Sequence, residues 1–228
     1  MLITPKDILI VGDSFCHHRS ATTDWPIVFV KELTGQSETP NGNGYNGASW
    51  WSARQCLLKE ISHHHFKVLI ICHTQFSRIP NDLNIGITPT CLDFNSIAVP
   101  SNVKHLVDKN QIHIASKYYY EQLFSLDFHK WAQKAWFEEL DSILETLSIP
   151  HIIHLYCFGL NQSNHYKFNQ GKTCLNILKD SWVKAGDENT TTRNHMTQDQ
   201  NQIFAKNLAK IVKNYEDYPK VEHFKLFE

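Results

Sequence analysis

Short apolar runs alternate with amphipathic segments along this chain of 228 residues. Uninterrupted apolar runs at 8–11 (ILIV), 67–72 (KVLIIC) and 151–158 (HIIHLYCF) have the length and composition of strands that are buried on both faces. Strands of this kind occur in parallel sheets. The pattern therefore predicts three central parallel strands.

Helix signals lie between and after these runs. Asp24 precedes an apolar-periodic segment that Gly35 stops, and a second helix is expected over about 49–61. Apolar residues recur every three or four positions from about 117 to 147, which predicts one long amphipathic helix that buries Trp131, Ala135, Trp136, Leu140, Ile143, Leu144 and Leu147 and ends before Pro150.

The last helix is expected to begin with a capping box formed by Thr197 and Gln200. Its apolar stripe consists of Phe204, Leu208, Ile211 and Tyr215. His195 therefore lies on the loop immediately before this helix.

Three segments show no such period. Residues 36–47 are mostly loop with room for a very short strand, and 161–193 are polar with one short helical candidate at 175–184. Residues 78–115 form an irregular insertion, and a loop of this length is often a lid or a binding loop.

Together these elements predict a single domain over 1–228 with an α/β/α sandwich around a mainly parallel sheet. In such sheets ligands bind at the carboxyl ends of the strands. Ser14 and the loops that follow residues 72 and 157 all emerge there.

Composition and charge limit the classes of partner and cofactor that we expect for this protein. Net charge is −1 and the 22 basic residues are scattered, which argues against nucleic acid. No apolar run is long enough for a signal peptide or a membrane span, so we expect a cytoplasmic protein. The six cysteines form no CxxC pair and the 14 histidines no zinc spacing, so we expect reduced thiols, no metal and no cofactor.

Three short motifs are spread from one end of the chain to the other: GDS at 12–14, YNGASWWS at 45–52 and NHMTQDQNQIFAKNLAKIV at 194–212. Their order and separation resemble the SGNH hydrolases, also called the GDSL family. The resemblance implies a flavodoxin-like sandwich and hydrolysis of carboxylic esters. It also implies roles for three residues: Ser14 as nucleophile, Gly47 as a backbone donor to the oxyanion, and His195 as general base.

The same residues are chemically suited to these roles. A serine hydroxyl is a weak nucleophile at neutral pH and needs a base within hydrogen-bond reach, which an imidazole provides. The oxyanion needs donors already aimed at it, and the N–H groups of Gly47 and Ser14 are candidates.

The sequence departs from the family pattern at two places. The third block, Gly-x-Asn-Asp, is replaced by CHTQFSR at 72–78, so Thr74 or Gln75 is expected to donate to the oxyanion in place of the asparagine. The aspartate three residues before the histidine is replaced by Thr192. Either Asp187 or Glu188 is the acid, or a backbone carbonyl orients His195 and leaves a serine–histidine dyad.

Asp13, Arg78 and Trp50 are the candidate substrate contacts, and a small-molecule or carbohydrate ester, for example an acetylated sugar, is the expected substrate. The two departures favour an alternative, a catalytically silent carbohydrate-binding or assembly protein of the same fold. A nucleotide-binding protein is less favoured because the turn after the first strand has no glycine-rich phosphate loop.

Overall fold

A computed structural model describes residues 2–17, 23–42, 44–45, 47–88, 97, 99–156, 166–174 and 196–214. Its parallel strands form one sheet in the order β2-β1-β3-β4-β5. The strands are β1 (Ile8–Asp13), β2 (Gly44–Tyr45), β3 (Val68–His73), β4 (His151–Tyr156) and β5 (Lys172–Cys174). The expected α/β class with a parallel sheet is confirmed.

The central strands are buried on both faces, as their apolar runs predict. Every residue of β1 and β3 is buried, and the register pairs Ile8 with Val68. β1 runs two residues further than expected, through Gly12 and Asp13. Gly12 suits this place because a Cβ there would lie 2.5 Å from the Cβ of Cys72.

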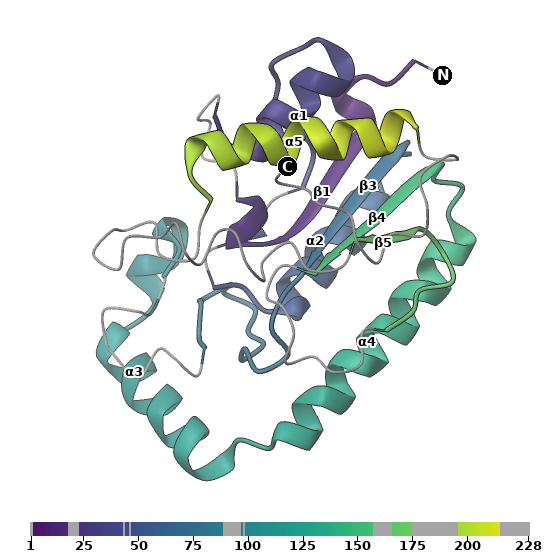
Figure 1. Ribbon diagram of the computed structural model, residues 1–228. Helices are drawn as coiled ribbons and strands as arrows, with labels where there is room; N and C mark the ends of the chain where they lie inside the picture. The colour runs from purple at the N-terminus through teal and green to yellow at the C-terminus, as the bar shows by residue number, and fades with distance from the viewer. Residues whose placement is uncertain are drawn as a thin grey trace.

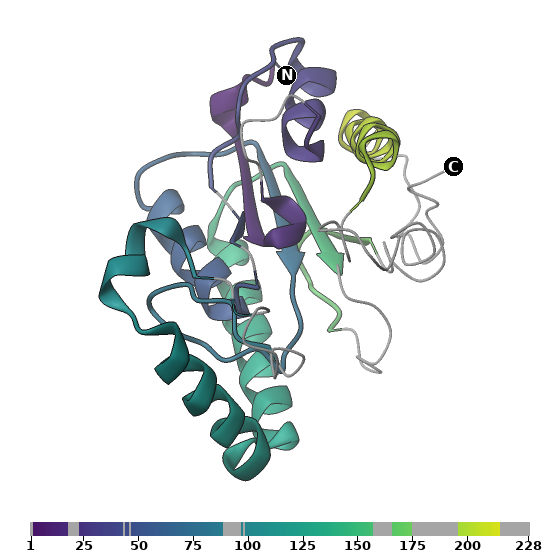
Figure 2. The same cartoon turned by 90° about the vertical axis from the view of Figure 1, so that its left-hand side faces the viewer.

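Helices cover both faces of the sheet (Figures 1 and 2). α1 (Trp25–Thr34) and α5 (Gln198–Lys213) lie on one face, and α2 (Trp50–Ile61) and α4 (Leu126–Thr146) on the other. Side chains alternate along β1 between the two faces of the sheet. Ile8 and Ile10 therefore pack in the core on the side of α1 and α5, and Leu9 and Val11 in the core on the side of α2 and α4.

The predicted ends of α1 and the predicted start of α5 are confirmed, whereas Tyr215, expected on the apolar stripe of α5, lies outside the described residues. Asp24 is the N-cap of α1, and Gly35 ends it with a φ of 79°. Thr197 and Gln200 form the capping box of α5. The capping box satisfies backbone N–H groups that the start of α5 would otherwise leave without partners.

The single long helix expected over 117–147 is wrong. α3 (Lys109–Tyr118) passes into a π-helical turn (Tyr119–Leu123), and α4 begins only at Leu126. The Ser125 hydroxyl accepts a hydrogen bond from the Phe128 amide and so starts a new helix. Trp131, expected in the buried stripe, is 64% exposed because the first part of α4 extends past the sheet (Figure 1).

The insertion at 78–115 is more regular than the sequence suggests. A 3-10 helix spans Ser101–Leu106, and α3 starts within the segment at Lys109, capped by the Asp108 side chain. Ile85, Ile87 and Ile97 form a small core of their own. β5 is an addition that the sequence did not predict, and the helix expected at 175–184 lies outside the described residues.

None of the helices in the described ranges has both the length and the apolar character needed to cross a bilayer.

Candidate active site

The candidate site lies where β1 and β3 end. The connections leave these two strands toward opposite faces of the sheet, and such a switch point is where doubly wound sheets bind ligands. Ser14 opens a 3-10 turn (Ser14–Cys16) directly after β1. Residues 74–78 follow β3 at the neighbouring position. The sheet therefore brings the candidate nucleophile and the replaced third block side by side.

The turn presents the Ser14 side chain in a half-buried position. Asp13 caps the turn, since its carboxylate accepts a hydrogen bond from the Phe15 amide at 3.0 Å. Within the described residues the Ser14 hydroxyl has no hydrogen-bond partner. The nearby Cys16 thiol is fully buried, and burial raises its pKa well above the ordinary value, so this thiol stays protonated and is shielded from a ligand.

A buried ion pair holds together the chain segments that form the candidate site. One guanidinium nitrogen of Arg78 lies 2.7 Å from a carboxylate oxygen of Asp13 and 2.8 Å from the carbonyl oxygen of Ala48. Asp13 is 0% exposed and Arg78 5%. The structure therefore gives no support to direct substrate contact by Asp13 and Arg78, which are buried and bound to each other; together with Ala48 they join three chain segments.

Thr74 belongs to the same network. Its hydroxyl donates to the Asp13 carboxylate at 3.2 Å, and its side chain is buried. A hydroxyl proton held by a carboxylate is not available to an oxyanion, so the structure does not support Thr74 in that role. Gln75 is half-buried, and its side chain makes no hydrogen bond within the described part of the chain.

Gly47 occupies a position that only glycine fits well. Its φ is +70°, and a Cβ there would lie 2.7 Å from the Cα of Gly86. Gly47 directly precedes Ala48, whose carbonyl oxygen Arg78 holds. The left-handed backbone and the close approach explain why a glycine stands beside the site.

His195 and Asp187 lie outside the described residues. The helix that follows them, however, packs on the turn that carries Ser14. The rings of Phe15 and Phe204 meet edge to face with centroids 5.6 Å apart. Met196, the residue after His195, is buried in the same core cluster as Phe15.

A second buried polar group lies between β3 and β4. His154 donates from Nε2 to the carbonyl oxygen of Gln170, so its Nδ1 accepts a hydrogen bond from His73 Nε2 at 3.0 Å. Phe168 stacks on His154 with centroids 3.7 Å apart. Burial lowers the pKa of His154 to about 4 and that of His73 well below its usual value, so both rings are neutral.

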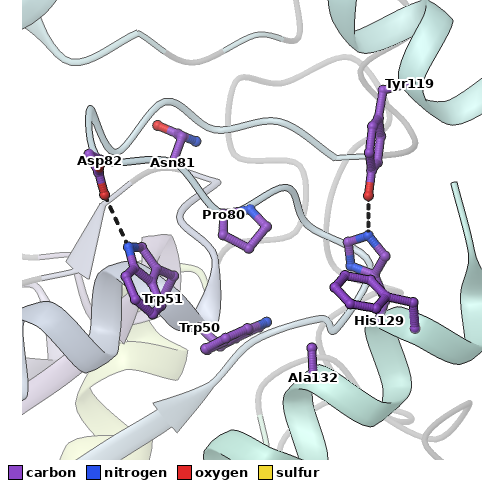
Figure 3. Close-up of a pocket in the computed structure, with 9 residues that line it drawn as sticks. Trp50, Trp51, Pro80, Asn81, Asp82, Tyr119, His129 and Ala132 are labelled. Carbon is purple, nitrogen blue, oxygen red and sulfur yellow. Dashed lines mark hydrogen bonds between the residues drawn. The ribbon is translucent and has the colours of Figure 1, made fainter. Parts of the chain in front are cut away.

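Trp50 lines a pocket of about 410 Å³ (Figure 3). The prediction that Trp50 is a binding residue thus has a cavity to act in. Ser14 and Gly47 do not line the pocket. Phe128 and His129 also line the pocket. Sequence reasoning did not single them out, because no local pattern shows that residues of different segments converge.

These features define a doubly wound α/β protein with a serine at the switch point of its sheet. No protein-family model, curated protein or solved structure matches the chain significantly. Its function therefore has to be inferred from the residues of the site.

Proposed function

We propose that this protein is a serine hydrolase of the SGNH type that cleaves carboxylic esters. The observation that carries the proposal is the placement of Ser14 at the carboxyl end of β1, where its side chain is half-buried and its hydroxyl has no hydrogen-bond partner among the described residues. The strand order is that of flavodoxin-like sheets, and helices on both faces fit the three-layer sandwich of this family.

In the proposed reaction the Ser14 hydroxyl attacks the ester carbonyl while His195 takes its proton, and Asp187 orients the imidazole. The N–H groups of Ser14 and Gly47 and the side-chain amide of Gln75 stabilise the oxyanion. His195 then protonates the leaving alkoxide, and water releases the acyl group by the same steps. The packing of α5 on the Ser14 turn supports His195 as the partner, since residue 196 is anchored in the shared core.

One observation favours the second candidate, a silent carbohydrate-binding or assembly protein. The Thr74 hydroxyl serves Asp13, so the third block contributes no side-chain donor at the position of the family asparagine. A protein that has lost the reaction can keep such a network for stability alone.

The test compares hydrolysis of p-nitrophenyl acetate by the wild type and by Ser14→Ala, His195→Ala and Ser52→Ala. Ser52 is the matched control, because it is a buried serine on α2 outside the site. We expect kcat/KM to fall by about 10³-fold or more in the first two variants and to stay unchanged in the control.

A fluorophosphonate probe, which labels activated serines, gives a second readout. Labelling of the wild type at Ser14 and loss of labelling in His195→Ala support the hydrolase. Equal background rates in all four folded proteins, without labelling, contradict it and favour the silent protein.

A further inference from the structure

The pocket in Figure 3 lies apart from the Ser14 turn, at the corner formed by the starts of α2 and α4, the π-helical turn and the loop at 80–82. We infer that this pocket binds a compact organic cation, in particular a quaternary ammonium group. The inference does not depend on the proposed hydrolysis.

Aromatic rings make up most of the wall. The indoles of Trp50 and Trp51 stand nearly perpendicular, at 85° with centroids 5.9 Å apart, and so form a corner. Trp136 stacks on Trp50 with centroids 6.4 Å apart, which holds that indole in place. Figure 3 shows Trp51 on one side of Trp50 and His129 on the other, with Tyr119 above His129. Rings arranged around a space in this way offer several π faces to one ligand.

The polar groups of the wall are mostly committed to the protein. The Asn81 side chain bonds the backbone of Ile79 and Ile85 through both its amide nitrogen and its oxygen. His129 Nδ1 donates to the carbonyl oxygen of Phe76 at 3.0 Å, so its Nε2 accepts from the Tyr119 hydroxyl. Both ring nitrogens of His129 therefore have hydrogen-bond partners within the protein.

Two polar groups of the wall stay open to a ligand: the carboxylate of Asp82 and the indole N–H of Trp50, which has no hydrogen-bond partner among the described residues. The Asp82 side chain is exposed, and one of its oxygens accepts from the Trp51 indole at 3.2 Å. The pocket therefore combines π faces with one negative charge. The guanidinium of Arg54, which is paired with Glu139, lies 5.1 Å from the Trp51 centroid, so this ring already makes one cation–π contact within the protein.

This chemistry favours an onium ion over a sugar. A sugar carries several hydroxyls that need partners, and the committed groups of Asn81, Tyr119 and His129 offer none, which leaves the Trp50 indole N–H and the Asp82 carboxylate for all of them. A quaternary ammonium group needs no hydrogen bond, only π faces and a counter-charge. The volume of about 410 Å³ is within the range of small-molecule sites.

The test measures binding of choline, tetramethylammonium and 3,3-dimethyl-1-butanol by isothermal titration calorimetry at low salt. The last compound is the uncharged isostere of choline, so it separates charge recognition from apolar burial. We expect choline to bind at least about tenfold more tightly than the isostere.

Two variants locate the site. Trp50→Leu removes a π face, and Asp82→Asn removes the charge but keeps an oxygen for the Trp51 indole. We expect each to weaken choline binding at least about fivefold. Each variant has a matched control. Trp131→Leu, at an exposed tryptophan of α4 that does not line the pocket, is the control for Trp50→Leu. Asp127→Asn, which removes one negative charge from α4, is the control for Asp82→Asn.

Equal affinities for choline and its isostere would overturn the inference, because the pocket would then be merely apolar. Choline binding that persists in both Trp50→Leu and Asp82→Asn would also overturn it. Asp82→Asn keeps the test valid even where Trp50→Leu fails to fold, since Asp82 is exposed.

Discussion

Replacing Arg78 by methionine is the most informative test of the buried network. The change leaves the Asp13 carboxylate, which is 0% exposed, without its cation. Removing one partner of a buried ion pair costs about 3–5 kcal/mol, because the remaining charge is desolvated and unpaired. Asp13 keeps hydrogen bonds from Phe15 and Thr74, so we expect a loss near the lower limit, about 3 kcal/mol.

Urea unfolding followed by tryptophan fluorescence and circular dichroism measures this loss. The matched control is Lys134→Met, which breaks the ion pair of Lys134 with Glu138, with side chains 68% and 57% exposed. Exposed pairs one helical turn apart contribute about 0.3–0.5 kcal/mol, so the control should remain close to the wild type.

The double variant Asp13→Asn, Arg78→Met sharpens the prediction. It contains no buried charge, so it should be more stable than Arg78→Met alone even though it carries one substitution more. A loss below about 1 kcal/mol in Arg78→Met, or a double variant less stable than that single one, would refute the account of the network as a buried ion pair.

Three further predictions concern stability. Burial lowers the pKa of His154 to about 4 from 6.5 in the unfolded chain, so the unfolded state binds more protons between these pH values. The contribution of His154 to stability is therefore complete above pH 6.5 and falls by up to about 3 kcal/mol toward pH 4. Urea titrations at several pH values measure this loss, and a flat profile would contradict it. Gly47→Ala should lower the free energy of unfolding by about 1–3 kcal/mol, and by more than Gly35→Ala does. Both glycines have a positive φ, but of the two only Gly47 closely approaches another backbone segment, at Gly86. Thermal unfolding compares the two variants, and equal losses of stability would show that the contact relaxes freely. Ser52→Ala should leave stability unchanged or raise it by about 1 kcal/mol, because the buried hydroxyl has no hydrogen-bond partner in the described part of the chain; a clear loss in the same assay would reveal a missing partner.

The buried network of Asp13, Thr74 and Arg78 also explains how the site stays ordered although residues 72–78 differ from the third block of the SGNH pattern. Arg78 joins the end of β1 to the segment before α2, and these two segments carry Ser14 and Gly47. Changes in Arg78 should therefore affect the proposed reaction through the position of these groups rather than through contact with substrate.

Sequence reasoning predicted the elements whose signals are local. The strands β1, β3 and β4 follow from apolar runs, and α1 and α5 from the caps at Asp24 and Thr197. It failed at Ser125, where a hydroxyl bonded to the Phe128 amide starts a new helix within a continuous apolar period. It also missed β5, which is only three residues long and is defined by its pairing with β4.

Some residues of the candidate site could also be predicted from local sequence, whereas the roles of others depend on the tertiary structure. A serine after a buried strand and a glycine before a helix are visible in the order of residues, so Ser14 and Gly47 could be proposed from the sequence. Whether Asp13, Thr74 and Arg78 face substrate or each other depends on how separated segments meet, and only the tertiary structure decided that they bind one another. The reason is physical: periodicity and capping act over a few residues, whereas burial and pairing of polar groups are set by contacts between residues more than 60 positions apart in the chain.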